Sequence, residues 1–258
     1  LPKQLLVSGY NTGLSSKNGQ IYTYVGTNLS NSIAGALTFV APYSGKIEFA
    51  DTKGIGIGSA GKANPFWTMH DKGEKVGIAV YHNDEKIWPA DSDYKVLTGD
   101  KWEGGVKTAG TTKMDFPDLG TLTVTRGDKI RIALIPLTQG WGYLTLSPRV
   151  DYTVVDAIQP ELPSEMPSYS SVDSVAIAQS NQEFRSDSAW IYTVKRTKLD
   201  ETTGYNLPYT DWFYPDLALG NSDNVGVNET LGKQMNIAGS NAGVAAYNNK
   251  VYTFVGSS

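Results

Sequence analysis

Residues 76–89 read VGIAVYHNDEKIWP, and this stretch decides the fold. Apolar residues alternate with other residues from Val76 to Val80, which is the pattern of a β-strand with one buried face. Asn83-Asp84 is a turn signal, and Ile87-Trp88 begins a return strand. The stretch therefore predicts two strands joined by a tight turn.

The same pattern occurs on both sides of this stretch. ALTFVAPYSGKIEFAD (36–51) turns at Pro42 to Gly45, and GTLTVTRGDKIRIALIP (120–136) turns at Arg126 to Asp128. None of the predicted strands shows a sustained helical period, and the 27 Gly and 12 Pro interrupt the chain every few residues. The sequence therefore predicts an all-β fold built from β-sandwich lobes.

A segment rich in Pro and Ser interrupts the strand pattern at residues 156–173, DAIQPELPSEMPSYSSVD. Such a composition is typical of a connector between structural units. We therefore expect a two-lobed chain, with a β-sandwich lobe at 1–155 and a smaller β lobe at 174–258. The 258 residues are enough for either one large or two smaller domains.

The two ends of the chain resemble each other. LPKQLLVSGYNTGLSSKNGQIYTYVGTN (1–28) and LGKQMNIAGSNAGVAAYNNKVYTFVGSS (231–258) align without gaps and are identical at eleven of twenty-eight positions. Two interpretations are open. The chain is part of a longer array of related units, and so of a larger multimodular protein, or one ancient hairpin was duplicated within it.

The composition argues against several classes of function. A net charge of −4 without a run of Lys or Arg argues against binding of nucleic acid. No apolar stretch is long enough for a membrane span, and LPKQLLVSGY is not a signal peptide, so we expect that segment to be absent or removed. The absence of cysteine excludes disulfides, thiol catalysis and zinc–thiolate sites, and favours an exported bacterial protein.

Motifs of catalysis are weak or incomplete. GIGSAG at Gly56 to Gly61 matches a dinucleotide fingerprint, but no helical pattern follows it, so we expect a loop. His70 and His82 have no neighbours that complete a catalytic set, and we expect His82 to be solvated. Three carboxylate pairs, Asp91/Asp93, Asp115/Asp118 and Asp211/Asp216, lie in turn-like contexts, where Asp caps or bends the chain. We therefore predict no catalytic residue and no cofactor, with a structural calcium ion near GNSDN (220–224) as an open alternative.

The aromatic residues suggest a binding surface. A sugar has flat apolar faces edged with hydroxyls, so its binders combine exposed aromatic rings with nearby polar groups. Trp88 and Trp190 follow strand alternation, and we expect them in the core. The other tryptophans lie in polar or Gly- and Pro-rich stretches that predict loops, where each either covers the sandwich edge or contacts a ligand. The candidate ligand-binding residues are Trp67, Trp102, Gln139, Trp141, Tyr143, Tyr209, Asp211, Trp212 and Tyr214.

Three segments carry a resemblance to a known group: FVAPYSGKIEF (39–49), VGIAVYHNDEKIWP (76–89) and FPDLGTLTVTRGDKIRI (116–132). Together they resemble the β-sandwich units appended to carbohydrate-active, cell-surface proteins of Firmicutes, although Ala41 replaces the aromatic residue that precedes the proline there. The two-lobed, aromatic-rich layout is similar to starch-binding domains of the gut bacterial starch adherence system, the amylosome. That resemblance implies α-1,4-glucan as the ligand, held between the lobes by stacking aromatics.

These observations predict a non-catalytic carbohydrate-binding module at a bacterial cell surface or outside the cell. The main alternative is a structural or adhesive repeat that spaces a surface protein, because the long repeat and the connector are typical of such arrays. A third alternative is a lyase or glycosidase on a β scaffold, which needs only two carboxylates across a cleft.

Overall fold

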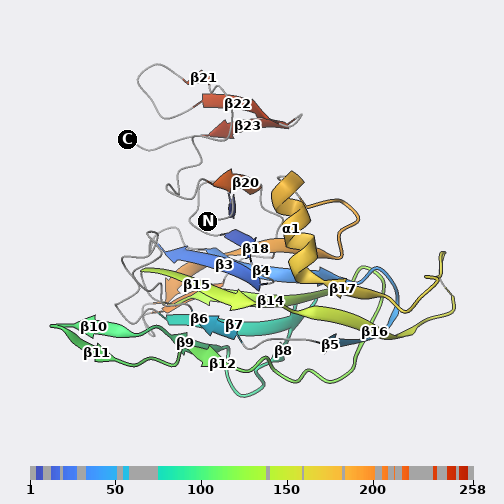
Figure 1. Cartoon of the computed structure of the whole chain (residues 1–258), viewed down its shortest axis with the longest axis horizontal. Helices are drawn as coiled ribbons and strands as arrows, with labels where there is room; N and C mark the ends of the chain where they lie inside the picture. Colours follow the sequence, from blue (N-terminus) through green and yellow to red (C-terminus); the bar gives the residue numbers. More distant parts are fainter. Residues whose placement is uncertain are drawn as a thin grey trace.

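The computed structural model is an all-β protein with antiparallel sheets, and one helix lies among the residues described (Figure 1). The predicted fold class is confirmed. In several strands only the backbone is described. The structure describes residues 4–7, 13–17, 20–27, 33–50, 55–57, 75–137, 140–158, 160–181, 184–200, 205–208, 212, 217–220, 235–236, 243–247 and 250–254.

The central sheet has the strand order β19-β18-β4-β14-β7-β8, and β9 also pairs with β7. Every residue from Ile130 to Pro136 is buried, and the same holds for Ala34 to Phe39. These strands are almost continuous apolar runs because both faces of the sheet are covered. The strands are β4 (Ile33–Val40), β7 (Lys75–His82), β8 (Glu85–Trp88), β9 (Lys95–Thr98), β14 (Lys129–Pro136), β18 (Trp190–Asp200) and β19 (Tyr205–Pro208).

A second sheet has the order β13-β5-β16-β17. Its strands are β5 (Gly45–Ala50), β13 (Leu122–Val124), β16 (Arg149–Val155) and β17 (Ser168–Ser170). Side chains of this sheet and of the central sheet form one buried apolar cluster, an arrangement consistent with a β-sandwich. The cluster includes Phe39, Ile47, Ile130, Ile132, Val150, Tyr152, Trp190 and Tyr192.

The N-terminal sheet has the order β12-β6-β15-β3-β2-β1-β20. A separate hairpin, β10 (Lys101–Glu103) with β11 (Val106–Thr108), projects from the left of Figure 1. A small three-stranded sheet consists of β21 (Met235–Asn236), β22 (Gly243–Tyr247) and β23 (Lys250–Phe254). The N-terminal sheet contains β1 (Gln4–Val7), β2 (Gly13–Lys17), β3 (Gln20–Thr27), β6 (Ile55–Ile57), β12 (Lys113–Met114), β15 (Gly140–Leu146) and β20 (Leu217–Gly220).

Strands from before and after the Pro/Ser-rich segment share sheets. β18 pairs with β4 along seven residues, from Trp190↔Phe39 to Arg196↔Ile33, and β20 pairs with β1. The two expected lobes are thus linked by backbone pairing. Their division at 156–173 stays a prediction.

Helix α1 (Ser171–Asn181) begins inside the segment that the sequence predicts as a connector. The Ser170 hydroxyl accepts a hydrogen bond from the Asp173 N–H at 3.3 Å, as an N-cap does. Val175 and Ala178 are its buried apolar residues, too few to give a strong helical period in the sequence. Of the residues described, none forms a helix with the length and apolar character needed to span a membrane.

The turns at Pro42–Gly45 and Arg126–Asp128 do not close hairpins. β4 and β14 belong to the central sheet, whereas β5 and β13 belong to the second sheet, so both turns carry the chain from one sheet to the other. Only the central stretch forms the predicted hairpin, β7–β8. The hairpin prediction was wrong at the other two turns because alternation and turn residues specify strands and a reversal, but not the partner strand.

The turn at Asn83-Asp84 and the turn at Arg126 to Asp128 are hydrogen-bonded to each other. Asn83, in the left-handed conformation (φ 54°), accepts a hydrogen bond from the Lys129 N–H at 2.9 Å and donates one to Asp128 at 3.0 Å. Asp128 also accepts from the Thr125 N–H at 2.8 Å and lies 3.0 Å from His82 Nε2. His82 is half-buried in this network, so its expected solvation was wrong. His82, Asn83 and Asp128 therefore stabilise these two turns.

We expect Asp128→Asn to weaken this network in a pH-dependent way. Burial alone would raise the pKa of Asp128, but hydrogen bonds from Thr125, Asn83 and His82 hold that pKa below its ordinary value of 3.8. The stabilisation is therefore fully present above about pH 4 and is lost as the pH falls through the lowered pKa. At neutral pH the variant should lose about 1–2 kcal/mol of unfolding free energy.

Urea titrations of both proteins at pH 7 and near pH 2.5 measure this difference. The deficit of Asp128→Asn should shrink at the lower pH, because the contribution of the charged carboxylate is lost progressively as the pH falls below about 3.8 toward the lowered pKa. An equal deficit at both pH values would contradict a role for the charged form.

Candidate functional site

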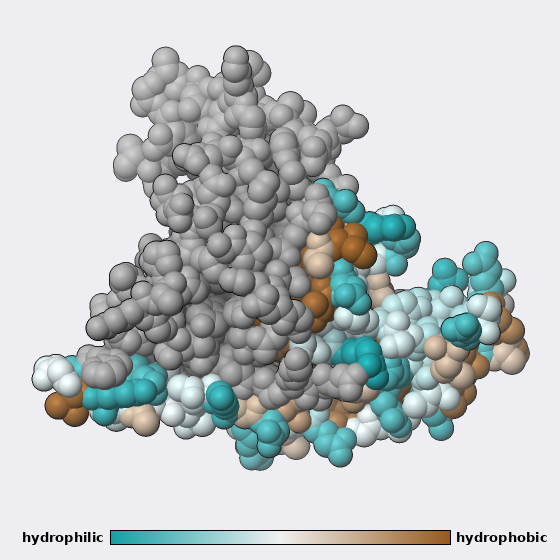
Figure 2. Space-filling view, in the orientation of Figure 1, coloured by the Kyte–Doolittle hydropathy of each residue, from teal (hydrophilic) through white to brown (hydrophobic). Residues whose placement is uncertain are grey.

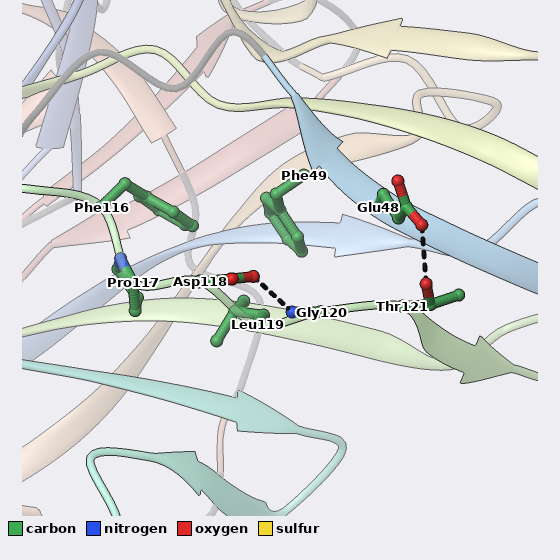
Figure 3. Close-up of a pocket in the computed structure, with 8 residues that line it drawn as sticks. All are labelled: Glu48, Phe49, Phe116, Pro117, Asp118, Leu119, Gly120 and Thr121. Carbon is green, nitrogen blue, oxygen red and sulfur yellow. Dashed lines mark hydrogen bonds between the residues drawn. The ribbon is translucent and has the colours of Figure 1, made fainter.

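A pocket of about 410 Å³ lies between β5 and the segment that leads into β13 (Figure 3). Its volume is within the range of small-ligand sites, about 300–1,000 Å³. Half of its lining residues are apolar or aromatic, and the others carry carboxylate, hydroxyl or backbone polar groups. The lining residues are Glu48, Phe49, Phe116, Pro117, Asp118, Leu119, Gly120 and Thr121.

Two stacked phenylalanines form the aromatic wall of this pocket. The ring centroids of Phe49 and Phe116 are 5.4 Å apart, with an angle of 25° between the planes. Phe49 also packs edge-on against Trp190, at 6.4 Å and 75°. Trp190 is fully buried, and its indole N–H donates to the Tyr169 carbonyl at 2.9 Å. The wall is therefore fixed to the core and costs little entropy when a ligand binds.

Polar groups border the wall. The Thr121 hydroxyl donates a hydrogen bond of 2.6 Å to Glu48, and the Gly120 N–H donates one of 2.9 Å to Asp118. Gly120 has φ of 59°, which suits glycine, and Asp118 stabilises the turn around it. Figure 3 shows both hydrogen bonds beside the aromatic rings. Glu48 and Asp118 are exposed and can accept further hydrogen bonds from a ligand.

Strand pairing brings these two segments together. β13 pairs antiparallel with β5, with Leu122 opposite Ile47. Thr121 and Glu48 are the next residues along this register, and their side chains are hydrogen-bonded. The pocket therefore lies where the sheet pairing of β5 and β13 gives way to the turn at 117–120. A rigid aromatic wall beside hydrogen-bond acceptors suits a neutral ligand with apolar faces and hydroxyl groups.

Metal ligands are not grouped in the part of the chain that the structure describes: no three His, Asp or Glu side chains there lie close enough to hold an ion. Residues 221–224 of the predicted calcium segment GNSDN lie outside the described residues. Calcium therefore stays an open alternative.

Trp212 lies on the face of the central sheet away from the shared core. It is half-buried and packs edge-on against Tyr81, at 6.0 Å and 64°. The Arg131 guanidinium is 5.7 Å from the ring centroid and the Lys195 ammonium is 5.6 Å from it, both within cation–π range. Trp212 is therefore anchored on the sheet. It packs against the buried cluster Ala34, Ile135 and Leu137.

Two of the predicted loop tryptophans lie in strands instead. Trp102 is in β10, and Trp141 is in β15 together with Tyr143. The loop prediction was wrong for β15 because Gly140 and Gly142 suggest a loop, whereas pairing with β3 and β6 holds the segment extended. The side chains of all three aromatics lie outside the described part of the structure.

The hairpin that carries Trp102 presents an exposed apolar residue. Val106 in β11 is 68% exposed, and Figure 2 shows a brown patch at the end of this hairpin. The remaining predicted ligand residues lie outside the described residues, and their roles stay predictions. They are Trp67, Gln139, Tyr209, Asp211 and Tyr214.

The two tryptophans predicted for the core are in strands. Trp190 in β18 is fully buried, which confirms its prediction. Trp88 in β8 is half-buried and packs against the core. Phe49 and Phe116 are not among the predicted ligand-binding residues, because the prediction took only tryptophan and tyrosine as aromatic platforms for a ligand. The stretch FPDLG (116–120) could have indicated this site, because in it an aromatic residue precedes a turn that carries an acidic side chain.

All the pocket residues belong to two of the three sequence segments that resemble the β-sandwich units of carbohydrate-active, cell-surface proteins. Glu48 and Phe49 end the first motif (39–49), and Phe116 to Thr121 begin the third (116–132). Comparison of the chain with protein-family models, with curated proteins and with solved structures gives no significant match.

Proposed function

We propose that this chain is a non-catalytic carbohydrate-binding module, and that starch-type α-glucan is its ligand. The observation that carries the proposal is the pocket in which the stacked Phe49 and Phe116 rings lie beside Glu48, Asp118 and Thr121. The sequence motifs that line it support the same function. We further propose that the module acts at a bacterial cell surface or outside the cell, as part of a larger multimodular protein.

The chemistry of the pocket matches a pyranose. Its C–H faces can pack on a phenylalanine ring, while hydroxyls at its rim donate hydrogen bonds to carboxylates. Exposed Glu48 and Asp118 would repel the carboxylates of an acidic polymer such as pectin. These groups therefore favour a neutral glucan over an acidic polysaccharide.

The carboxylates suit binding better than hydrolysis. A glycosidase needs one carboxylic acid that its apolar surroundings keep protonated, opposite a second carboxylate. Glu48 and Asp118 are both exposed. Each already accepts a hydrogen bond from a neighbouring residue of the pocket, which restricts the conformations of the carboxylate.

Affinity-gel electrophoresis of the whole chain tests the proposal with amylopectin, a mixed-linkage β-glucan and pectin in separate gels. We expect amylopectin to retard the wild-type chain. Phe116→Ala should weaken binding about tenfold, because one aromatic stacking contact contributes about 0.5–1.5 kcal/mol beyond its buried area. Glu48→Ala, at an exposed position, should weaken binding without a change in fold.

Leu162→Ala is a matched control, because Leu162 is 59% exposed and does not line the pocket. Circular dichroism of each variant establishes that the fold is retained. If none of the three polysaccharides retards the wild-type chain, the proposal is wrong. If Trp212→Ala or Trp141→Ala abolishes retardation and both pocket variants bind normally, the ligand lies on the aromatics predicted from the sequence instead of in the pocket.

The alternative function is that of a structural or adhesive repeat. The observation that favours it is the matching strand pairing of the two repeat copies: Gly13 pairs with Tyr24, and Gly243 pairs with Phe254. This alternative predicts no retardation by any polysaccharide.

A further inference from the structure

The two repeat copies form the same three-stranded unit. In the first copy, Leu5 of β1 pairs with Leu14 of β2, and in the second, Met235 of β21 pairs with Val244 of β22. Each of these residues lies 230 positions after its counterpart, since 235 − 5 and 244 − 14 both equal 230. The register is therefore the same in both copies.

The second hairpin of each unit has the same match. β2 and β3 pair from Gly13↔Tyr24 to Lys17↔Gln20, and β22 and β23 pair from Gly243↔Phe254 to Tyr247↔Lys250. Each residue of the second hairpin again lies 230 positions after its counterpart in the first. The sequence also keeps the strand residues, with Tyr-Thr at 22–23 and at 252–253.

The surroundings of the two units differ. The first copy lies inside the N-terminal sheet, where β3 pairs with β15 and β1 pairs with β20. The second copy forms a sheet of its own, and no further described strand pairs with β21 or β23. Figure 1 shows this sheet beyond β20 and away from the central sheet. Open strand edges of this kind readily accept another strand.

We propose that residues 231–258 are a second occupant of the position that residues 1–28 fill. When the first copy leaves the N-terminal sheet, β23 pairs with β15 in place of β3, and β21 pairs with β20 in place of β1. The matching register supplies the same backbone donors and acceptors in the same order.

The topology permits this exchange within one chain. β20 runs antiparallel to β1, and Gly220 at the end of β20 lies opposite Gln4. The counterpart of Gln4 is Gln234 (4 + 230), and thirteen residues separate Gln234 from Gly220 in the sequence (234 − 220 − 1). A reversal between antiparallel strands needs as few as about two to five residues. The same pairing between two chains would join copies end to end, as in domain swapping.

Proline substitutions in the full chain test the proposal. β3 lies between β2 and β15, so Thr23→Pro breaks backbone pairing inside the sheet. Thr253→Pro is the matched variant in the second copy. We expect each single variant to keep a cooperative urea unfolding transition near the wild-type midpoint, because one intact copy remains. The double variant should lose that transition or show a much larger shift than the two single shifts together.

A cross-link identifies the exchanged pairing directly. Leu144 of β15 pairs with Thr23, whose counterpart is Thr253. The chain has no cysteine, so a Leu144→Cys/Thr253→Cys pair gives one defined disulfide. We expect this disulfide to form when Thr23→Pro is also present. Leu144→Cys/Thr23→Cys in the otherwise unchanged chain is the positive control.

The size of the cross-linked product distinguishes the two routes. A cross-linked monomer shows exchange within one chain, and a cross-linked dimer shows exchange between chains; both support the proposal. The proposal is overturned if the shifts of the proline variants are simply additive. It is equally overturned if the positive control cross-links but the 144–253 pair does not.

Discussion

Replacing Trp190 by alanine is expected to lower the free energy of unfolding by about 3–5 kcal/mol. Trp190 is fully buried in β18, and its ring centroid lies 5.5 Å from that of Phe39. Its indole N–H bonds to the Tyr169 carbonyl, which the alanine variant leaves without that donor. Because a domain is stable by only about 5–15 kcal/mol, this one change removes a large share.

Urea unfolding followed by circular dichroism measures the loss. Val106→Ala is the control, because Val106 is 68% exposed and its truncation should change the midpoint little. Trp190→Ala should also weaken glycan retardation under conditions where the variant stays folded, because Phe49 loses its edge-on contact. Equal midpoints for the two variants would contradict the central place of Trp190 in the core.

The second large effect is expected for Gly35→Ala in β4. A Cβ atom at Gly35 would overlap the hydroxyl oxygen of Tyr192 and lie 2.6 Å from the ring carbon Cζ. Tyr192 is 2% exposed in the core and cannot move aside without displacing its neighbours. Overpacking of this kind costs about 1–3 kcal/mol, and the severe overlap places Gly35→Ala at the upper end of that range or beyond it.

A double-mutant cycle shows whether Tyr192 is the cause. Leucine has neither the Cζ nor the hydroxyl that overlaps, so Gly35→Ala should cost clearly less in a Tyr192→Leu background. Tyr192→Phe should leave stability unchanged or raise it, because the buried hydroxyl has no hydrogen-bond partner among the residues that the structure describes. An unchanged cost of Gly35→Ala in the leucine background would place the strain elsewhere.

The sequence predicted the local elements well where a short pattern is sufficient. Alternation between Val76 and Val80 marks β7, and Asn83-Asp84 marks the turn that follows it. The burial of Trp190 follows from alternation too. Helix α1 was missed because only Val175 and Ala178 are its buried apolar residues, and such a helix depends on packing against β2 and β18.

The candidate site was predicted less well because it depends on contacts between distant residues. Phe49 and Phe116 are 67 positions apart (116 − 49), and neither signals a partner by itself. Their stacking follows from the pairing of β13 with β5, which sets Leu122 opposite Ile47. Trp212 shows the same dependence, since Arg131 and Lys195 come from two other segments to flank its ring.

The amino-acid sequence by itself determined the all-β class, the main turns and the repeat, because alternation, turn residues and self-similarity are local properties of the chain. It did not determine which strands pair. The tertiary structure shows that the segments at 42–45 and 126–128 connect two sheets. It also places Glu48 beside Thr121. The physical reason is that backbone groups of any two extended segments can pair, so the burial of side chains across the whole fold decides between the possible partners.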